Sequence, residues 1–122
     1  MIDTIYKTVA STEVTKWELV GHVNDFSKEG GECVKVGDLQ IAVFNFTSRG
    51  EWYACQNVCP HKMQAILSRG MIGSHGDEPK VACPFHKKTF SLKTGENLNG
   101  NESAIATYPV KIENENVYIG LS

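Results

Sequence analysis

Several features that mark other protein classes are missing from this sequence of 122 residues. No apolar run approaches the ~20 residues that a transmembrane helix needs, so we expect no membrane span. Residues 1–4 do not begin the basic-then-apolar pattern of a secretory signal peptide. Internal repeats and low-complexity segments are absent too. Together these absences predict a cytoplasmic protein, in which thiols stay reduced and cysteines are better candidates for ligands than for disulfides.

A strong charge of either sign is also missing, because the net charge is only −2. This argues against a nucleic-acid-binding protein, which needs a basic surface. The charge is nevertheless uneven: residues 59–94, called the basic segment below, hold six Lys/Arg and two Asp/Glu, a net +4. This excess is consistent with an electropositive surface for an acidic partner, and equally with ordinary solvated lysines.

Helical periodicity is lacking, and short strand patterns take its place. Residues 39–46 are rich in β-branched and aromatic side chains. These side chains alternate between two faces, one with Ile41, Val43 and Asn45 and the other with Ala42, Phe44 and Phe46. Residues 105–112 and 117–121 are expected to be the two closing strands of a hairpin. Many short strands in a chain of this length predict one all-β domain over residues 1–122, a sandwich or a small barrel.

Two of the four cysteines and two of the four histidines stand in two matched motifs. The motifs are Cys59-Pro60-His61 and Cys83-Pro84-Phe85-His86, with 21 residues between them. Each motif offers one thiolate and one imidazole. A Rieske [2Fe–2S] cluster requires this donor set, because two Cys bind one iron and two His replace Cys on the other. The pattern therefore predicts Cys59, His61, Cys83 and His86 as cluster ligands.

Two other interpretations of these motifs are available. A structural zinc site also takes two Cys and two His, but its usual spacing pairs like with like, whereas both pairs here are mixed. A zinc-stapled β-module that only binds a partner is therefore one alternative. A disulfide between Cys59 and Cys83 would leave the histidines and prolines of both motifs without a role.

The other two cysteines, Cys33 and Cys55, fit no ligand spacing. Each lies in a strand pattern, and a free cysteine behaves as a small hydrophobic residue. We expect both side chains to be buried.

The two motifs, with residues 89–96 that follow, resemble those of Rieske ferredoxin domains. Residues 67–73 (Leu-Ser-Arg-Gly-Met-Ile-Gly) are similar to the segment between the ligand loops in the small subunit of NAD(P)H-dependent nitrite reductase. The resemblance covers about residues 16–121. It implies a Rieske-type β-sandwich with a small inserted cluster-binding subdomain at about residues 57–98.

The resemblance also implies a function. The chain would transfer single electrons through one [2Fe–2S] cluster and would not catalyse a reaction alone. Its partner would be a large subunit with flavin and sirohaem that docks at the cluster tip and uses NAD(P)H to reduce nitrite to ammonium. The alternative is a free-standing Rieske ferredoxin of a ring-hydroxylating dioxygenase system, and motif spacing does not separate these two functions.

Overall fold

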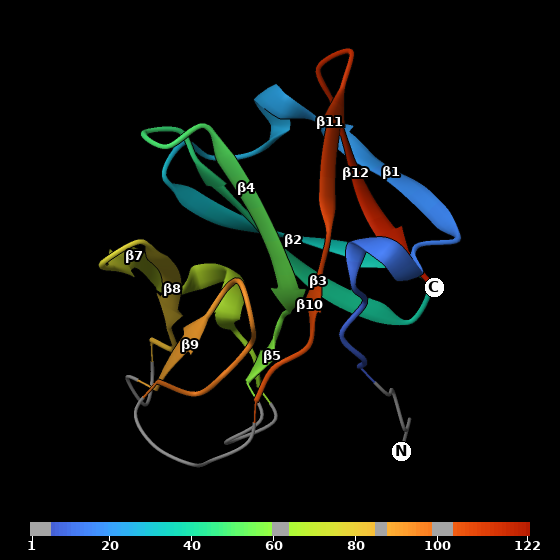
Figure 1. The fold of residues 1–122 in the computed structure, drawn as a ribbon. Helices are drawn as coiled ribbons and strands as arrows, with labels where there is room; N and C mark the ends of the chain where they lie inside the picture. Colours follow the sequence, from blue (N-terminus) through green and yellow to red (C-terminus); the bar gives the residue numbers. More distant parts are fainter. Residues whose placement is uncertain (1–5, 60–63, 85–87, 99–103) are drawn as a thin grey trace.

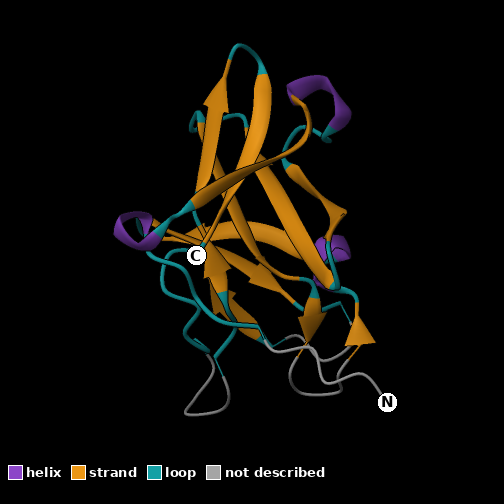
Figure 2. Ribbon diagram, turned by 90° about the vertical axis from the view of Figure 1, so that its right-hand side faces the viewer, coloured by secondary structure: helices purple, strands orange, loops and turns teal. Residues whose placement is uncertain are grey.

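The computed structural model describes residues 6–59, 64–84, 88–98 and 104–122, and in these ranges the regular structure is mostly antiparallel strands (Figure 1). Helical structure is limited there to short 3₁₀ turns (Figure 2): η1 (Ser11–Glu13), η2 (Val23–Asp25) and η3 (Leu67–Arg69). None of the described helices is long and apolar enough to cross a membrane. The all-β prediction is confirmed.

The largest sheet has the strand order β10-β4-β3-β2. Its strands are β2 (Gly30–Val36), β3 (Leu39–Phe46), β4 (Glu51–Gln56) and β10 (Thr107–Tyr108). Two tight turns connect β2 to β3 and β3 to β4, and each contains a glycine with positive φ, Gly37 at 60° and Gly50 at 65°. Glycine suits these positions because residues with a Cβ are strained in this region.

A second sheet has the order β1-β12-β11. Its strands are β1 (Lys16–His22), β11 (Val110–Glu113) and β12 (Asn116–Leu121). The expected hairpin between β11 and β12 is present. The prediction of one strand over residues 105–112 is wrong, because β10 pairs with β4 whereas β11 pairs with β12. Pro109 separates the two, and a proline cannot donate to a strand ladder, so the chain changes sheets there.

Strand β3 is buried on both faces from Ile41 onward, and its side chains alternate between the two faces as predicted. Its Ile41 and Val43 belong to one core, which also contains Val117 and Ile119 of β12. Its Ala42, Phe44 and Phe46 belong to another core, shared with the small strands that follow β4. The sheet containing β3 therefore has an apolar core on each side, one toward β12 and one toward the segment that carries the ligand motifs.

The segment between β4 and β10 forms two small sheets. One pairs β5 (Val58–Cys59) with β6 (Gln64–Ala65), and the other has the order β7-β8-β9. The strands of the second are β7 (Met71–His75), β8 (Glu78–Ala82) and β9 (Thr89–Ser91). β5 and the adjoining ends of β8 and β9 lie at the end of the molecule opposite the β11–β12 turn (Figure 1).

Candidate functional site

The first ligand motif leaves the fold from strand β5. Cys59 ends this strand, and its backbone pairs with Gln64 of β6, just as Val58 pairs with Ala65. The four residues 60–63 therefore connect two paired strands. His61 lies outside the described residues, so its ligand role stays a prediction.

The second ligand motif begins directly after strand β8. The backbone N–H of Cys83 donates to the carbonyl oxygen of Lys88 at 2.8 Å, and the neighbouring Ala82 pairs with Thr89. These contacts hold the two ends of the loop together. Only 1% of the Cys83 side chain is exposed. His86 lies outside the described residues.

One apolar core contacts the second motif and the segment that follows the first. It contains Cys83 with Val81 and Phe90 of the strands around the second motif, and Leu67, which follows the first. The strands that lead into the two motifs lie at one end of the molecule (Figure 1), so the motifs can offer their donors to a common centre. Two thiolates and two imidazoles are the donors that a Rieske cluster needs, so the residues fit this cofactor.

Ser91, at the end of β9, holds the turn that follows the second motif. The Ser91 hydroxyl is fully buried, donates to Glu78 Oε2 at 2.6 Å, and accepts from the N–H groups of Lys93 and Thr94 at 3.2 Å each. The next residue along, Gly95, has φ of 82° and lies so close to a neighbouring carbonyl that a Cβ would collide with it. The turn after β9 is thereby held to β8, which leads into the motif.

Both of the other two cysteines lie in strands, but only one of them is buried. Cys55 is fully buried, which confirms its prediction, and burial raises the pKa of its thiol well above the ordinary value. The prediction for Cys33 is wrong, because its side chain is exposed. Cys33 lies on β2, the edge strand of its sheet, and its Sγ accepts a hydrogen bond from Asn57 instead of packing in a core.

The sequence interpretation missed two residues at this site, the adjacent amides Gln56 and Asn57. Both are buried, and they immediately precede Val58 and Cys59. The available signal was the pair of amides itself, because a buried polar side chain is costly unless hydrogen bonds compensate for the loss of water.

The basic segment is only partly described. Among its described basic side chains, Arg69 and Lys93 are exposed, whereas Lys80 and Lys88 are half-buried. Lys62 and Lys87, which neighbour the histidines in sequence, lie outside the described residues. The electropositive docking tip stays a prediction.

The match to a family model decides the identity of the fold. Residues 16–120 match the model of the Rieske-like [2Fe-2S] domain, which is most of the chain. The chain belongs to this family. The cofactor of this Rieske-like chain is one [2Fe–2S] cluster, which accepts and returns one electron at a time when it is bound.

Three relatives of this Rieske-like chain indicate the range of proteins that use the domain. The NAD(P)H nitrite reductase large subunit of Klebsiella oxytoca is 34% identical over 104 residues, which cover 85% of this chain and 11% of that protein. This chain thus spans about a tenth of the length of that curated relative. The solution structure of the NAD(P)H nitrite reductase small subunit from Erwinia carotovora superposes with a TM-score of 0.75 and 32% identity, over 88% of this chain and 83% of that one.

The third relative comes from an oxygenase system. The ferredoxin subunit of 3-phenylpropionate/cinnamic acid dioxygenase from Shigella boydii is 34% identical over 92 residues. The match covers 75% of this chain and 82% of that protein.

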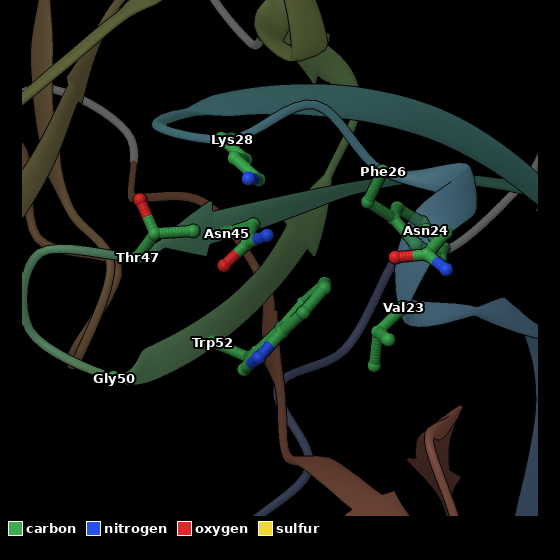
Figure 3. Close-up of a pocket in the computed structure, with 8 residues that line it drawn as sticks. All are labelled: Val23, Asn24, Phe26, Lys28, Asn45, Thr47, Gly50 and Trp52. Atoms are coloured by element: carbon green, nitrogen blue, oxygen red, sulfur yellow. The ribbon is translucent and has the colours of Figure 1, made fainter.

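A hollow of about 380 Å³ lies at the other end of β3 and β4, away from β5 (Figure 3). Its lining includes Asn45 and the rings of Phe26 and Trp52, which contact edge to face with centroids 5.5 Å apart. Cys83, the predicted ligand whose side chain the structure describes, does not line this hollow, so we do not assign it to the redox site.

Proposed function

We propose that this chain is a one-electron carrier whose cluster is held by Cys59, His61, Cys83 and His86. In this proposal residues 1–122 form one domain, and residues 57–98 are its cluster-binding subdomain. The observation that carries the proposal is the likeness to nitrite reductase small subunits in both sequence and fold, combined with two motifs that begin from strands at one end of the molecule. The chain's own residues would supply the donors and hold them, while the cluster supplies the redox chemistry.

The proposed partner is a large nitrite reductase subunit that carries flavin and sirohaem. The Klebsiella oxytoca relative supports this, because the segment similar to this chain makes up only 11% of that protein. The Erwinia carotovora relative supports a second arrangement, in which the small subunit is a separate chain of similar size. The same role, delivery of electrons within an NAD(P)H-driven nitrite reductase, accounts for both arrangements. We place this protein in the cytoplasm, where its thiols would stay reduced.

Docking would occur at the cluster tip. The net +4 of the basic segment supports this, because opposite charges on two partners raise their rate of encounter. Exposed Arg69 and Lys93 would contribute to that field. Electron transfer would then need no substrate pocket on this chain.

A second function has a specific observation in its favour. The dioxygenase ferredoxin from Shigella boydii is as similar in identity, at 34%, as the Klebsiella oxytoca relative. Its name identifies it as a ferredoxin subunit, so the same domain serves an oxygenase there. The choice between the two functions depends on the partner, which an experiment can supply.

Reconstitution separates these functions. The purified protein, loaded with its cluster, is mixed with a nitrite reductase large subunit, and oxidation of NAD(P)H is followed with and without nitrite. We expect nitrite-dependent turnover that rises with the concentration of this chain. A parallel assay replaces the large subunit with a ring-hydroxylating dioxygenase and its reductase. Turnover only in the parallel assay would overturn the nitrite reductase assignment.

A further inference from the structure

Gln56 and Asn57 lie between the body of the fold and the first ligand motif. Gln56 ends β4, and Asn57 precedes β5, which ends at Cys59. Gln56 is 8% exposed and Asn57 is 2% exposed. Buried amides are stable only where hydrogen bonds satisfy their donors and acceptors, so the partners of these two side chains reveal what they hold.

Asn57 binds the chain where it returns from the first motif. Its carbonyl oxygen accepts from the N–H groups of Ile66 at 3.0 Å and Leu67 at 2.9 Å. Its side-chain Oδ1 accepts from the N–H of Ser68 at 2.6 Å. Three successive backbone N–H groups therefore donate to one residue. These hydrogen bonds join the two ends of the loop that contains Cys59.

Asn57 also binds the body of the fold on two strands. Its backbone N–H donates to the carbonyl oxygen of Gln40 in β3 at 2.8 Å. Its Nδ2 donates to the Sγ of Cys33 on β2 at 3.4 Å. Every polar group of Asn57 thus has a partner, and the partners come from three separate segments of the chain.

Gln56 holds the strand that leads to the ligand. Its Nε2 donates to the carbonyl oxygen of Val58, the residue before Cys59, at 2.7 Å. Its Oε1 accepts from the N–H of Ala106 at 2.8 Å, and its own backbone N–H donates to the Ala106 carbonyl at 2.9 Å. The residue before the ligand is thereby connected to the segment next to β10.

We propose that Gln56 and Asn57 act as a pair of positioning residues for the first ligand loop, called the amide clamp here. The clamp fixes both ends of the first ligand loop. Its bond to Val58 holds the start of the loop, and its bonds to residues 66–68 hold the end. It thereby sets the position of the Cys59 backbone from which the thiolate reaches the cluster. This inference rests on the proposed ligand role of Cys59.

An amide side chain suits these contacts, because it offers a donor and an acceptor at the same time. Asn57 must accept from Ser68 and donate to Cys33 at once, and Gln56 must accept from Ala106 and donate to Val58. A carboxylate would lose the donor and bury a charge, whereas an apolar side chain would leave the Ser68 or Ala106 N–H unsatisfied. Residues beyond the ligands orient ligands and tune metal centres in this way.

The test compares the cluster-loaded wild type with N57A and with a matched control, N45A. Asn45 is also a buried asparagine, 7% exposed, but it lines the hollow at the other end of β3 (Figure 3). Three readouts are taken: the rate of cluster loss to a chelator, the reduction midpoint, and the width of the electron spin resonance lines of the reduced cluster. Line width reports a spread of ligand geometries, which a change in stability alone would not produce.

For N57A we expect cluster loss to accelerate on the order of tenfold, the usual lower range for loss of an outer-sphere partner, with broadened resonance lines. N45A should keep the wild-type rate, midpoint and line width. Wild-type values in N57A, or equal changes in N57A and N45A, would overturn the clamp.

A second variant covers the case in which N57A does not fold. Q56M removes both side-chain bonds of Gln56 while keeping a similar length and an apolar fill. We expect broadened lines in Q56M, and wild-type lines would overturn the clamp. The variant C59S tests the ligand assignment separately. A cluster that survives in C59S contradicts the proposed function. Cluster loss in C59S together with wild-type behaviour of N57A and Q56M contradicts only the clamp.

Discussion

The backbone N–H of Cys83 and the carbonyl oxygen of Lys88 are joined by a hydrogen bond of 2.8 Å, which closes the second ligand loop at its base. The first loop is closed differently, by the short β5–β6 pair and the bonds to Asn57. Both loops therefore start from fixed backbone positions. Fixed backbone positions at the base of the loops matter for a redox centre. The reduction potential of the cluster depends on the hydrogen bonds and the solvent exposure around it, and the loops determine both.

The first prediction concerns the cofactor. Purified without exposure to air, the protein should be brown-red, and when reduced it should give the low-average-g electron spin resonance signal of mixed nitrogen and sulfur ligation. C59S and C83S should abolish both signals, because each removes a thiolate from the same iron. C33S and C55S should retain them. A colourless protein with one bound zinc per chain would contradict the assignment.

The second prediction concerns the reduction midpoint, which should lie toward the low end of the Rieske range of about −150 to +300 mV. In the high-potential members of the Rieske family, a disulfide joins the two ligand loops, and two hydroxyl groups donate hydrogen bonds to the sulfurs of the cluster. This chain has Gln64 and Phe85 where that disulfide would be, and Lys88 and Phe90 where the hydroxyls would be. Without those hydroxyls the reduced cluster is less stabilised. A potentiometric titration measures the midpoint, and a value near the top of the range would contradict the prediction.

The third prediction concerns the electrostatics of docking. Changing Lys62, Lys87 and Lys88 to Glu should lower the association rate with the large subunit and weaken its dependence on salt, because opposite charges steer encounter. Stopped-flow reduction of the cluster at several salt concentrations measures this rate. A wild-type rate that does not change with salt would exclude electrostatic steering.

A matched variant controls for the change in net charge. K16E, K28E and K35E together make the same change at exposed positions outside the basic segment. This variant should associate faster than the variant of the basic segment. Equal losses in the two variants would show that net charge matters and the cluster tip does not.

The fourth prediction concerns the turn after β9. Gly95 has φ of 82°, and a Cβ there would also collide with the carbonyl oxygen of Ile105. Gly76 has φ of 64°, but a Cβ there would meet nothing within 4 Å. G76A should lower the free energy of unfolding by roughly 1–2 kcal/mol, the cost of the left-handed conformation. G95A should lower it further, and chemical denaturation of the two variants would show whether the additional loss exists.

The sequence by itself determined the donor chemistry and the strand pattern around it. Two mixed Cys/His motifs predicted the cluster, because the kind of donor atom largely decides which metal centre a protein can hold. The alternation over residues 39–46 predicted which side chains of β3 share a face, because successive side chains of a strand point in opposite directions. Both inferences depend only on local spacing, so they did not need the fold.

The tertiary structure alone decided which distant groups hold the site. Asn57 donates to Cys33, 24 positions away, and Gln56 accepts from Ala106, 50 positions away. The exposure of Cys33 and the change of sheet at Pro109 were likewise decided by which strands became neighbours. Hydrogen bonds and burial depend on distance and direction in space. Local spacing therefore predicts the ligands of this cluster, and the packing of separate strands determines what positions them.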